Sequence, residues 1–395
     1  MEYDFSRVND RRGTYCTQWD FTEDRFHRAG VLPFSISDTD FIIPEPITEK
    51  IKAVAERRIY GYTRWNHHDY KASIVNFFRR RFDADLSEDW IIYSPTVVYS
   101  ISLLIRLLSR PGDRVVCFNP MYDSFFTVIT GNERELVSCD LVHRDGRFEI
   151  DFDLLDRQLS GSRILLLCSP HNPTGRVWTR EEMDRIVELC RRHQTAIISD
   201  EIHMDIQIGK RRNIPLMQYA GTWPQVYTCS SSSKTFNTPG LIGSYVIIPD
   251  AGIRDAFLYH TRKVDFLNSP SILGMYATMI GYQECDDYIE QLCAYVRGNM
   301  EYLKQSIETQ LKDVSFTIPD ATYLAWIDCR KMPFTAEQIQ DALVNVGNVG
   351  IMKGETYGEN GTKYLRMNIG CPRSKLEEGF ARMKQSFDWL YQENR

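Results

Sequence analysis

Lys234 occupies an unusual position in the chain, in the stretch CSSSSKTFNTPG between Cys229 and Gly240. Serine runs and Pro-Gly pairs are typical of loops, and a loop lysine is usually a solvated charge. However, the preceding segment QVYT (225–228) and the following segment LIGSYVII (241–248) have the composition of β-strands. We therefore expect Lys234 at a turn between two buried strands, where a charge without a function is uncommon.

Polar or aromatic side chains follow three further strand-like runs. Asn172 lies in the loop SPHNPTG after RILLLC, Asp200 follows AIIS, and Tyr122 ends the stretch NPMY after RVVCF. Taken singly, these residues are explained by turn formation, helix capping and core packing. Because ligands bind beyond the carboxyl ends of the strands in parallel sheets, we expect all four positions to share one site.

Together the four side chains match the chemical groups of pyridoxal 5′-phosphate (PLP). A buried carboxylate such as Asp200 keeps a pyridinium nitrogen protonated, the Asn172 amide donates to the ring oxygen, and Tyr122 stacks on the ring face. Lys234 supplies the one amine that the ring aldehyde needs for a Schiff base. The phosphate needs hydroxyls and free backbone N–H groups at a helix N-terminus. These come from Ser231, Ser233, Val97 and Val98.

Other cofactors lack their sequence signatures. No G-x-G-x-x-G follows a strand and no G-x-x-x-x-G-K-[ST] occurs, so neither a dinucleotide site nor a P-loop is indicated. A metal site could be imagined in the stretch 200–205, but alternation along a strand would split its side chains between two faces. The candidate ligands there are Asp200, Glu201, His203 and Asp205. The stretch His67-His68-Asp69 fits the start of a surface helix better than a ligand set. We therefore expect no metal.

The pattern of elements predicts an α/β fold. Between residues 48 and 285, short apolar runs alternate with amphipathic helical stretches, which favours a mostly parallel sheet covered by helices on both faces. One of these helices begins with a capping box, formed by Thr179 and Glu182. After residue 285, a long polar helix and the strand-like runs ATYLAWIDCR and KYLRMNIGCPR indicate a smaller α+β domain, made of residues 1–47 and 286–395.

Composition and charge narrow the class of protein. The chain has 395 residues, 43% of them hydrophobic, and a formal net charge of −6, so we expect no nucleic-acid partner. Its ten cysteines include no C-x-x-C pair, which favours reduced thiols in a reducing compartment. The N-terminus has no apolar signal sequence, and no apolar run approaches the roughly 18 residues of a membrane span. We expect a cytoplasmic protein without a membrane partner.

Several motifs add a family resemblance. The order SPHNPTGRVWT, SDEIHMD, SSSSKTFN and YLRMNIGCPRSKLEEG resembles the aspartate-aminotransferase fold, fold type I, of PLP enzymes. Within that fold, DFSRVNDRRGTYCTQWD, LPFSISDTDF and YGYTRW are similar to the MalY/PatB group of cystathionine β-lyases. The resemblance covers almost the whole chain. It implies a homodimer whose large domain contains a seven-stranded, mostly parallel sheet.

The resemblance also implies roles for individual residues. Lys234 matches the Schiff-base lysine, and Arg366 in YLRMN matches the arginine that binds the substrate α-carboxylate, a task suited to its bidentate fork. Tyr62 in YGYTRW matches a tyrosine that reaches into the partner subunit's site. The remaining matches are Asp200 for the pyridine nitrogen, Asn172 for the ring oxygen, Tyr122 for stacking, and Ser231 and Ser233 for the phosphate.

Two positions depart from the family pattern. Thr96 replaces a glycine that is common in the phosphate-binding turn, which changes the backbone fit expected there. His203 stands where aminotransferases commonly carry a tyrosine that donates to the ring oxygen. This second difference disfavours tuning of the ring for transamination.

The resemblance implies a β-elimination. The lysine released by the substrate amine acts as a base at Cα, and a thiolate leaves from Cβ. Cystathionine would yield homocysteine, pyruvate and ammonia, and cysteine S-conjugates would yield other thiols. Two alternatives stay open: an aminotransferase, and a regulatory protein that modulates a maltose-regulon transcriptional activator through protein contacts.

Overall fold

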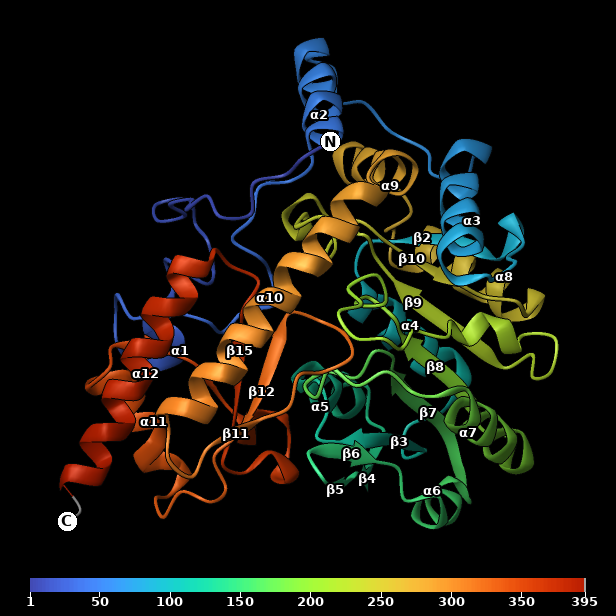
Figure 1. Cartoon of the computed structure of the whole chain (residues 1–395). Coiled ribbons are helices and arrows are strands. Elements are labelled where there is room, and N and C mark those ends of the chain that lie inside the picture. Colours follow the sequence, from blue (N-terminus) through green and yellow to red (C-terminus); the bar gives the residue numbers. More distant parts are fainter. Residues whose placement is uncertain (394–395) are drawn as a thin grey trace.

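A seven-stranded sheet forms the centre of the larger part of the chain (Figure 1). The computed structural model describes residues 1–393. The strand order is β2-β10-β9-β8-β7-β3-β4, and β10 is antiparallel to both of its neighbours while the other pairings are parallel. The strands are β2 (Ile91–Ser94), β3 (Arg114–Asn119), β4 (Glu135–Asp140), β7 (Ser162–Cys168), β8 (Ala196–Asp200), β9 (Val226–Ser230) and β10 (Ser244–Ile247). The predicted mostly parallel, seven-stranded sheet is confirmed.

Helices cover this sheet because each carries one apolar face. In α7, Met183, Ile186, Val187 and Cys190 are buried, as their spacing predicts. The predicted capping box is present, since the Thr179 hydroxyl accepts from the Glu182 amide while the Glu182 carboxylate accepts from the Thr179 amide. The helices of this part are α3 (His68–Phe82), α4 (Val97–Leu108), α5 (Asp123–Gly131), α6 (Phe152–Leu159), α7 (Arg180–His193), α8 (Ala251–Tyr259) and α9 (Ile272–Glu284). The short strands β5 (Val142–Arg144) and β6 (Arg147–Glu149) form a separate hairpin.

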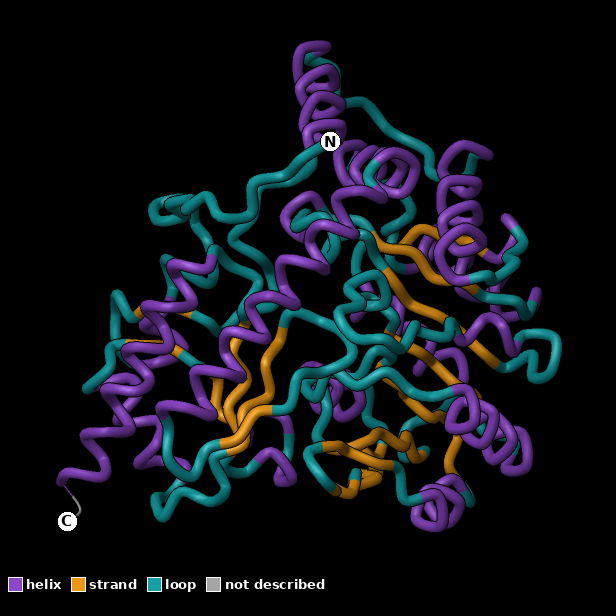
Figure 2. Tube along the Cα trace, in the orientation of Figure 1, coloured by secondary structure: helices purple, strands orange, loops and turns teal. Residues whose placement is uncertain are grey.

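A second, smaller sheet belongs to the C-terminal part, which lies to one side of the large sheet (Figures 1 and 2). Its order is β11-β12-β15-β14, with antiparallel pairings throughout. The strands are β11 (Ser315–Phe316), β12 (Leu324–Asp328), β14 (Met352–Lys353) and β15 (Tyr364–Asn368). The helices are α10 (Asp286–Gln310), α11 (Ala336–Asn345) and α12 (Arg373–Glu393).

The N-terminal stretch runs mostly as loop and joins both parts (Figure 2). After the short helix α1 (Thr22–Phe26), strand β1 (Leu32–Pro33) pairs in parallel with β13 (Val349–Gly350). Helix α2 (Glu45–Arg57) packs against α9 of the larger part. The domain boundary predicted at residue 48 therefore falls inside a helix.

Two predicted strands are shorter in the structure. The run AIISDEI (196–202) has the composition of a strand throughout, but the strand ends at Asp200, because the Asp200 carboxylate accepts from the Ile202 amide and starts a turn. Strand alternation therefore does not separate the side chains of Glu201, His203 and Asp205, and the prediction that it would is wrong for them. The run 241–248 contributes only Ser244–Ile247, because Pro239–Leu241 form a 3-10 turn.

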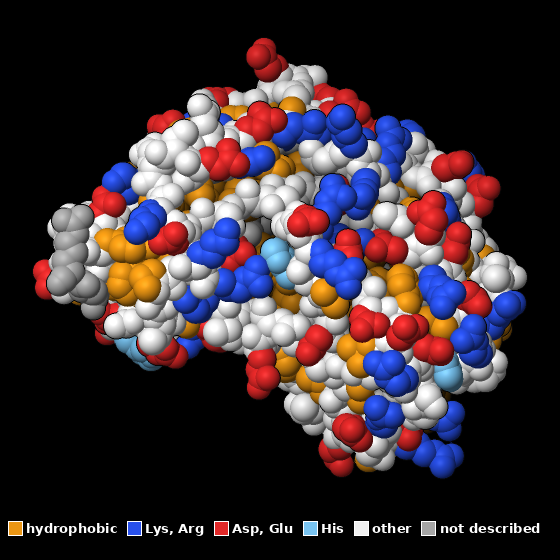
Figure 3. Space-filling view, turned by 60° about the horizontal axis from the view of Figure 1, so that its bottom comes forward, with side chains coloured by type: hydrophobic (Ala, Val, Ile, Leu, Met, Phe, Trp, Pro, Cys, Tyr) orange, Lys and Arg blue, Asp and Glu red, His pale blue; other side chains and the backbone are white. Residues whose placement is uncertain are grey.

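The surface carries charges of both signs. Figure 3 shows Lys and Arg side chains interspersed with Asp and Glu over one face. Within residues 1–393, no helix combines the length and apolar character needed to cross a membrane.

Candidate active site

The carboxyl ends of β7, β8 and β9 bring the predicted residues to one edge of the sheet. These three strands are parallel neighbours, and Cys168, Asp200 and Cys229 stand side by side in their register. The loop with Asn172 and the turn with Lys234 follow directly after the first and third of these strands. The structure thus brings Asn172, Asp200 and Lys234 to the same edge of the sheet.

Lys234 is a buried amine with one strong hydrogen bond. Its Nζ donates to the Ser37 carbonyl oxygen at 2.6 Å. Burial lowers the pKa of Lys234; the charge of Asp38 opposes this shift, whereas the charge of Arg366 adds to it. The neutral amine that a nucleophile or base requires is thus easier to reach here than in an exposed lysine.

Asp200 supplies a buried carboxylate at the same edge. Burial raises its pKa to about 6, although the hydrogen bond from the Ile202 amide, at 3.1 Å, and the charge of Lys234 both act to lower it. A positively charged ring nitrogen at this carboxylate would further favour its ionised form.

Arg366 approaches the site from strand β15 of the smaller sheet. It is buried, and its guanidinium donates to the Asn172 side-chain oxygen at 3.2 Å and to the Ser35 carbonyl at 2.9 Å. The same guanidinium lies over the Tyr357 ring, 4.5 Å from its centroid. Its Nε is buried and has no hydrogen-bond partner among the described residues.

Tyr122 and His203 complete the cluster. Tyr122 is half-buried at the start of α5, and its pKa is raised mainly by burial, with smaller effects of opposite sign from Asp200 and Arg366. Burial, together with the charges of Lys234 and Arg366, lowers the pKa of His203 to about 3, so the ring is neutral. Its Nδ1 is buried and has no hydrogen-bond partner among the described residues.

The protein groups predicted to bind the phosphate lie at the end of β9 and at the start of α4. The Ser231 hydroxyl bonds to the Ser233 hydroxyl and to the Gly243 carbonyl, at 2.9 and 2.6 Å. The next residue, Ser244, bonds to Ser94 at the end of β2, just before α4 begins. The amides of Val97 and Val98 are the first two of α4, where a helix has no internal acceptor for them.

Thr96, which stands where the family commonly has a glycine, caps a helix in this structure. It is the N-cap of α4, and its hydroxyl accepts from the Tyr99 amide at 3.1 Å. This bond uses the third amide of the helix and leaves the first two available.

Tyr62 lies apart from these residues within the single chain. Its side chain is fully exposed on the loop between α2 and α3. It borders a surface hollow that Arg262 and Asn268 also line.

Three residues of the site were missed by reasoning from the sequence. Ser37 holds Lys234 through its carbonyl, Tyr323 donates to that same carbonyl at 3.1 Å, and Tyr357 underlies Arg366. Ser37 belongs to the motif LPFSISDTDF, which was noted only for its family resemblance. Every residue type has the same backbone carbonyl, so the identity of Ser37 does not indicate this contact. The motif was the one feature of the sequence that indicated this segment.

The groups on this edge fit a phosphorylated pyridine aldehyde. They offer an amine, a carboxylate of raised pKa, a side-chain amide, and a helix N-terminus flanked by hydroxyls. Among the described residues, no set of three or more His, Cys, Asp or Glu side chains is arranged to hold a metal ion.

Comparisons with known proteins agree with this donor set. Residues 29–383 match the family described as Aminotransferase class I and II. Protein MalY of Escherichia coli is 40% identical over 96% of this chain and 97% of its own length, and cystathionine beta-lyase PatB of Bacillus subtilis is 32% identical over 96% and 98%. A crystal structure of a PLP-bound putative aminotransferase from Clostridium difficile is 32% identical, with a TM-score of 0.95 over 98% of this chain and 100% of that one. The chain therefore belongs to the class I and II aminotransferase family and, within it, to the group that contains MalY and PatB.

Proposed function

We propose that this protein is a PLP-dependent C–S β-lyase that cleaves L-cystathionine and related cysteine S-conjugates. The reaction removes the Cα proton, breaks the Cβ–S bond and releases a thiol, and hydrolysis of the remaining fragment gives pyruvate and ammonia. The observation that carries the proposal is the buried Lys234 amine of lowered pKa at the same strand edge as Asp200. The name of PatB, a cystathionine β-lyase of the same group, supports the choice of substrate.

Lys234 and Asp200 have separate tasks in this proposal. When bound, PLP supplies the electron sink for the negative charge that develops at Cα. Lys234 anchors the cofactor and then acts as the base that takes the Cα proton, for which its lowered pKa is suited. Asp200 holds the proton on the ring nitrogen, and Asn172 donates to the ring oxygen.

Other side chains orient the ligand. Tyr122 stacks on the ring face, and the neutral imidazole of His203 lies beside the ring. The phosphate is bound by the hydroxyls and helix amides of Ser231, Ser233, Val97 and Val98.

Arg366 binds the substrate α-carboxylate. Its guanidinium is already held by Asn172 and Ser35 and backed by the Tyr357 ring. A side chain fixed in this way loses little conformational entropy when the substrate binds, which favours affinity and correct orientation.

We also propose that the working form is a homodimer with Tyr62 reaching into the partner's site. Ile59, Tyr60 and Tyr62 are large side chains exposed on one loop, and a second exposed group comprises Val264, Phe266 and Leu267. Exposed apolar side chains grouped in this way are typical of interaction surfaces. A second copy of the chain would cover them and supply the hydroxyl of Tyr62 to the active site.

The reaction class is tested with L-cystathionine and no added 2-oxo acid. A β-lyase forms pyruvate and free thiol over many turnovers, because it needs no amino acceptor. An aminotransferase, the class to which the C. difficile protein is assigned, stops after one turnover under these conditions and resumes when a 2-oxo acid is supplied. Rapid amino transfer without thiol release would contradict the proposal. A PLP-loaded protein with neither activity would favour the regulatory alternative.

A further inference from the structure

The segment Ser35–Phe41, here called the strap, contacts both sides of the proposed active site. Its Ser37 carbonyl accepts from Lys234 Nζ at 2.6 Å and from the Tyr323 hydroxyl at 3.1 Å. Its Ser35 carbonyl accepts from the Arg366 guanidinium at 2.9 Å. One short backbone stretch thus holds the proposed base and the proposed carboxylate-binding group.

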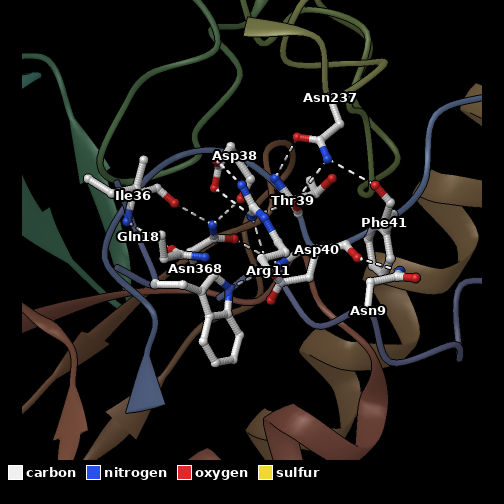
Figure 4. Close-up of polar contacts among 12 residues, drawn as sticks. Asn9, Arg11, Gln18, Ile36, Asp38, Thr39, Asp40, Phe41, Asn237 and Asn368 are labelled. Carbon is white, nitrogen blue, oxygen red and sulfur yellow. Dashed lines mark hydrogen bonds and ion pairs between the residues drawn. The ribbon is translucent and has the colours of Figure 1, made fainter. Parts of the chain in front are cut away.

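The strap is held mainly by hydrogen bonds to side chains from other segments of the chain (Figure 4). The Asn237 side chain, three residues after Lys234, bonds to the amide and carbonyl of Thr39 and to the Phe41 carbonyl, at 2.9–3.1 Å. The Asn368 side chain, two residues after Arg366, donates to the carbonyls on either side of Ser37. The position of Ser37 therefore depends on side chains from both sheets.

Arg11 joins these anchors from the N-terminal segment. Its guanidinium donates to both Asp38 carboxylate oxygens, at 3.2 and 2.7 Å, and to the Thr39 carbonyl and the Asp40 carboxylate, both at 3.0 Å. Burial alone would lower the pKa of Arg11, but the hydrogen bonds and charges of Asp38 and Asp40 raise it overall. The fork thus makes charge-assisted bonds to three consecutive residues of the strap.

Further side chains of the N-terminal segment bind the same strap. The Gln18 side chain accepts from the Ile36 amide at 3.1 Å, and the Trp19 indole donates to Asp40 at 3.0 Å (Figure 4 shows Gln18). Asn9 donates to the Asp40 carbonyl at 2.9 Å. The proposed reaction provides no role for the motif DFSRVNDRRGTYCTQWD. In the structure, side chains of this motif bind the strap through several hydrogen bonds.

We propose that Arg11 is a positioning residue, which acts through the strap to hold the Lys234 amine and the Arg366 guanidinium in place. The inference rests on the proposed function for its kinetic readout. Loosening the strap displaces Ser37 and Ser35 together, so the proton transfer and the binding of the substrate carboxylate weaken at the same time. A displacement of about 1 Å at such a site costs up to roughly 100-fold in rate.

The test compares R11Q with R7Q in the PLP-loaded protein. Arg7 lies four residues earlier on the same segment, is exposed, and its side chain makes no hydrogen bond or ion pair with the described residues. In R11Q we expect kcat/KM for L-cystathionine to fall roughly 10- to 100-fold, with a raised KM. We also expect faster deuterium uptake by a peptide that covers residues 35–41. R7Q should match the unsubstituted protein in both measurements.

A purely structural role for Arg11 would give a different result. Partial unfolding lowers the active fraction, so kcat per total protein falls while KM stays constant. The variant R11K keeps the charge beside Asp38 and Asp40 but loses the fork, and it serves if R11Q does not fold. A KM and a 35–41 uptake equal to those of R7Q, in R11Q or in a folded R11K, would overturn the inference. If the protein has no lyase activity, deuterium uptake still decides the role of Arg11, so the two failures are distinguishable.

Discussion

At the scale of single residues, the site contains buried ionisable groups whose pKa values are shifted in the direction that favours the uncharged form. Lys234 has a lowered pKa, and those of Asp200 and of its neighbour Glu201 are raised to about 6 and about 8, with burial as the largest cause in all three. Such groups cost stability, and clusters of them are typical of functional sites.

The first prediction concerns covalent attachment at Lys234. Borohydride reduction of the PLP-treated protein, followed by peptide mapping, should place the pyridoxyl group on Lys234. K234A should fold but lose at least roughly 100-fold in turnover, since anchor and base vanish together. K331A, at an exposed lysine, is the matched control and should retain full activity. A pyridoxyl group on another lysine would disprove the assignment.

The second prediction concerns Glu201 and pH. Its Oε1 accepts from the Leu216 amide and the Ser199 hydroxyl, while Oε2 is buried without a protein partner. With a folded pKa of about 8 and an unfolded pKa near 4.3, the folded state binds the extra proton between these values, so stability falls as pH rises through this window. E201Q removes this dependence and keeps an acceptor at the same place.

The measurement for Glu201 is the melting temperature at pH 5 and pH 8. The difference between E201Q and the unsubstituted protein should be more favourable to E201Q at pH 8. E377Q, at an exposed glutamate, controls for the loss of one charge. An equal difference at both pH values would show that Glu201 is already ionised in the folded protein.

At the scale of elements, the turn that carries Lys234 depends on a close helix contact. Helix α9 passes so near the 238–242 segment that a Cβ on Gly274 would lie 1.9 Å from the Ile242 carbonyl oxygen. On the same helix, Gly281 meets the Phe236 ring, two residues after Lys234. The two glycines thus allow α9 to pack closely against the turn that carries Lys234.

Two glycine substitutions test this contact. G274A should destabilise the protein by about 1–3 kcal/mol or more, because the obstructing atoms are backbone and cannot turn away. G298A lies within α10, where the nearest atom is the flexible end of Arg373 at 3.5 Å. It should be neutral or gain up to about 1 kcal/mol from helix propensity. Denaturant unfolding measures both, and equal effects would remove α9 as a specific support.

At the scale of the whole molecule, the proposed homodimer predicts complementation between two inactive variants. K234A lacks the base, and Y62A lacks the hydroxyl proposed to enter the partner's site. After mixing and subunit exchange, roughly half of the dimers are mixed, and each mixed dimer contains one site with both residues, so about a quarter of all sites should be active. Each variant alone is the control. Sedimentation showing an active monomer, or no recovery after proven exchange, would contradict a shared site.

What the sequence determined by itself was local. Strand and helix positions follow from apolar periodicity, and the start of α7 follows from Thr179 and Glu182, three residues apart. The convergence of Asn172, Asp200 and Lys234 was also predictable, because parallel strands end at one sheet edge. Each of these inferences depends on residues near in sequence or on a general rule of sheet topology.

What only the tertiary structure decided are contacts between distant segments and their electrostatic effects. Ser37 and Lys234 are 197 positions apart, and Ser35 and Arg366 are 331 positions apart. Such pairs leave no periodic pattern, because a carbonyl acceptor is the same in every residue type and the path of a loop depends on what packs around it. The pKa of Glu201 is likewise set by the depth of its burial, a property of all the elements packed around it and not of the glutamate itself.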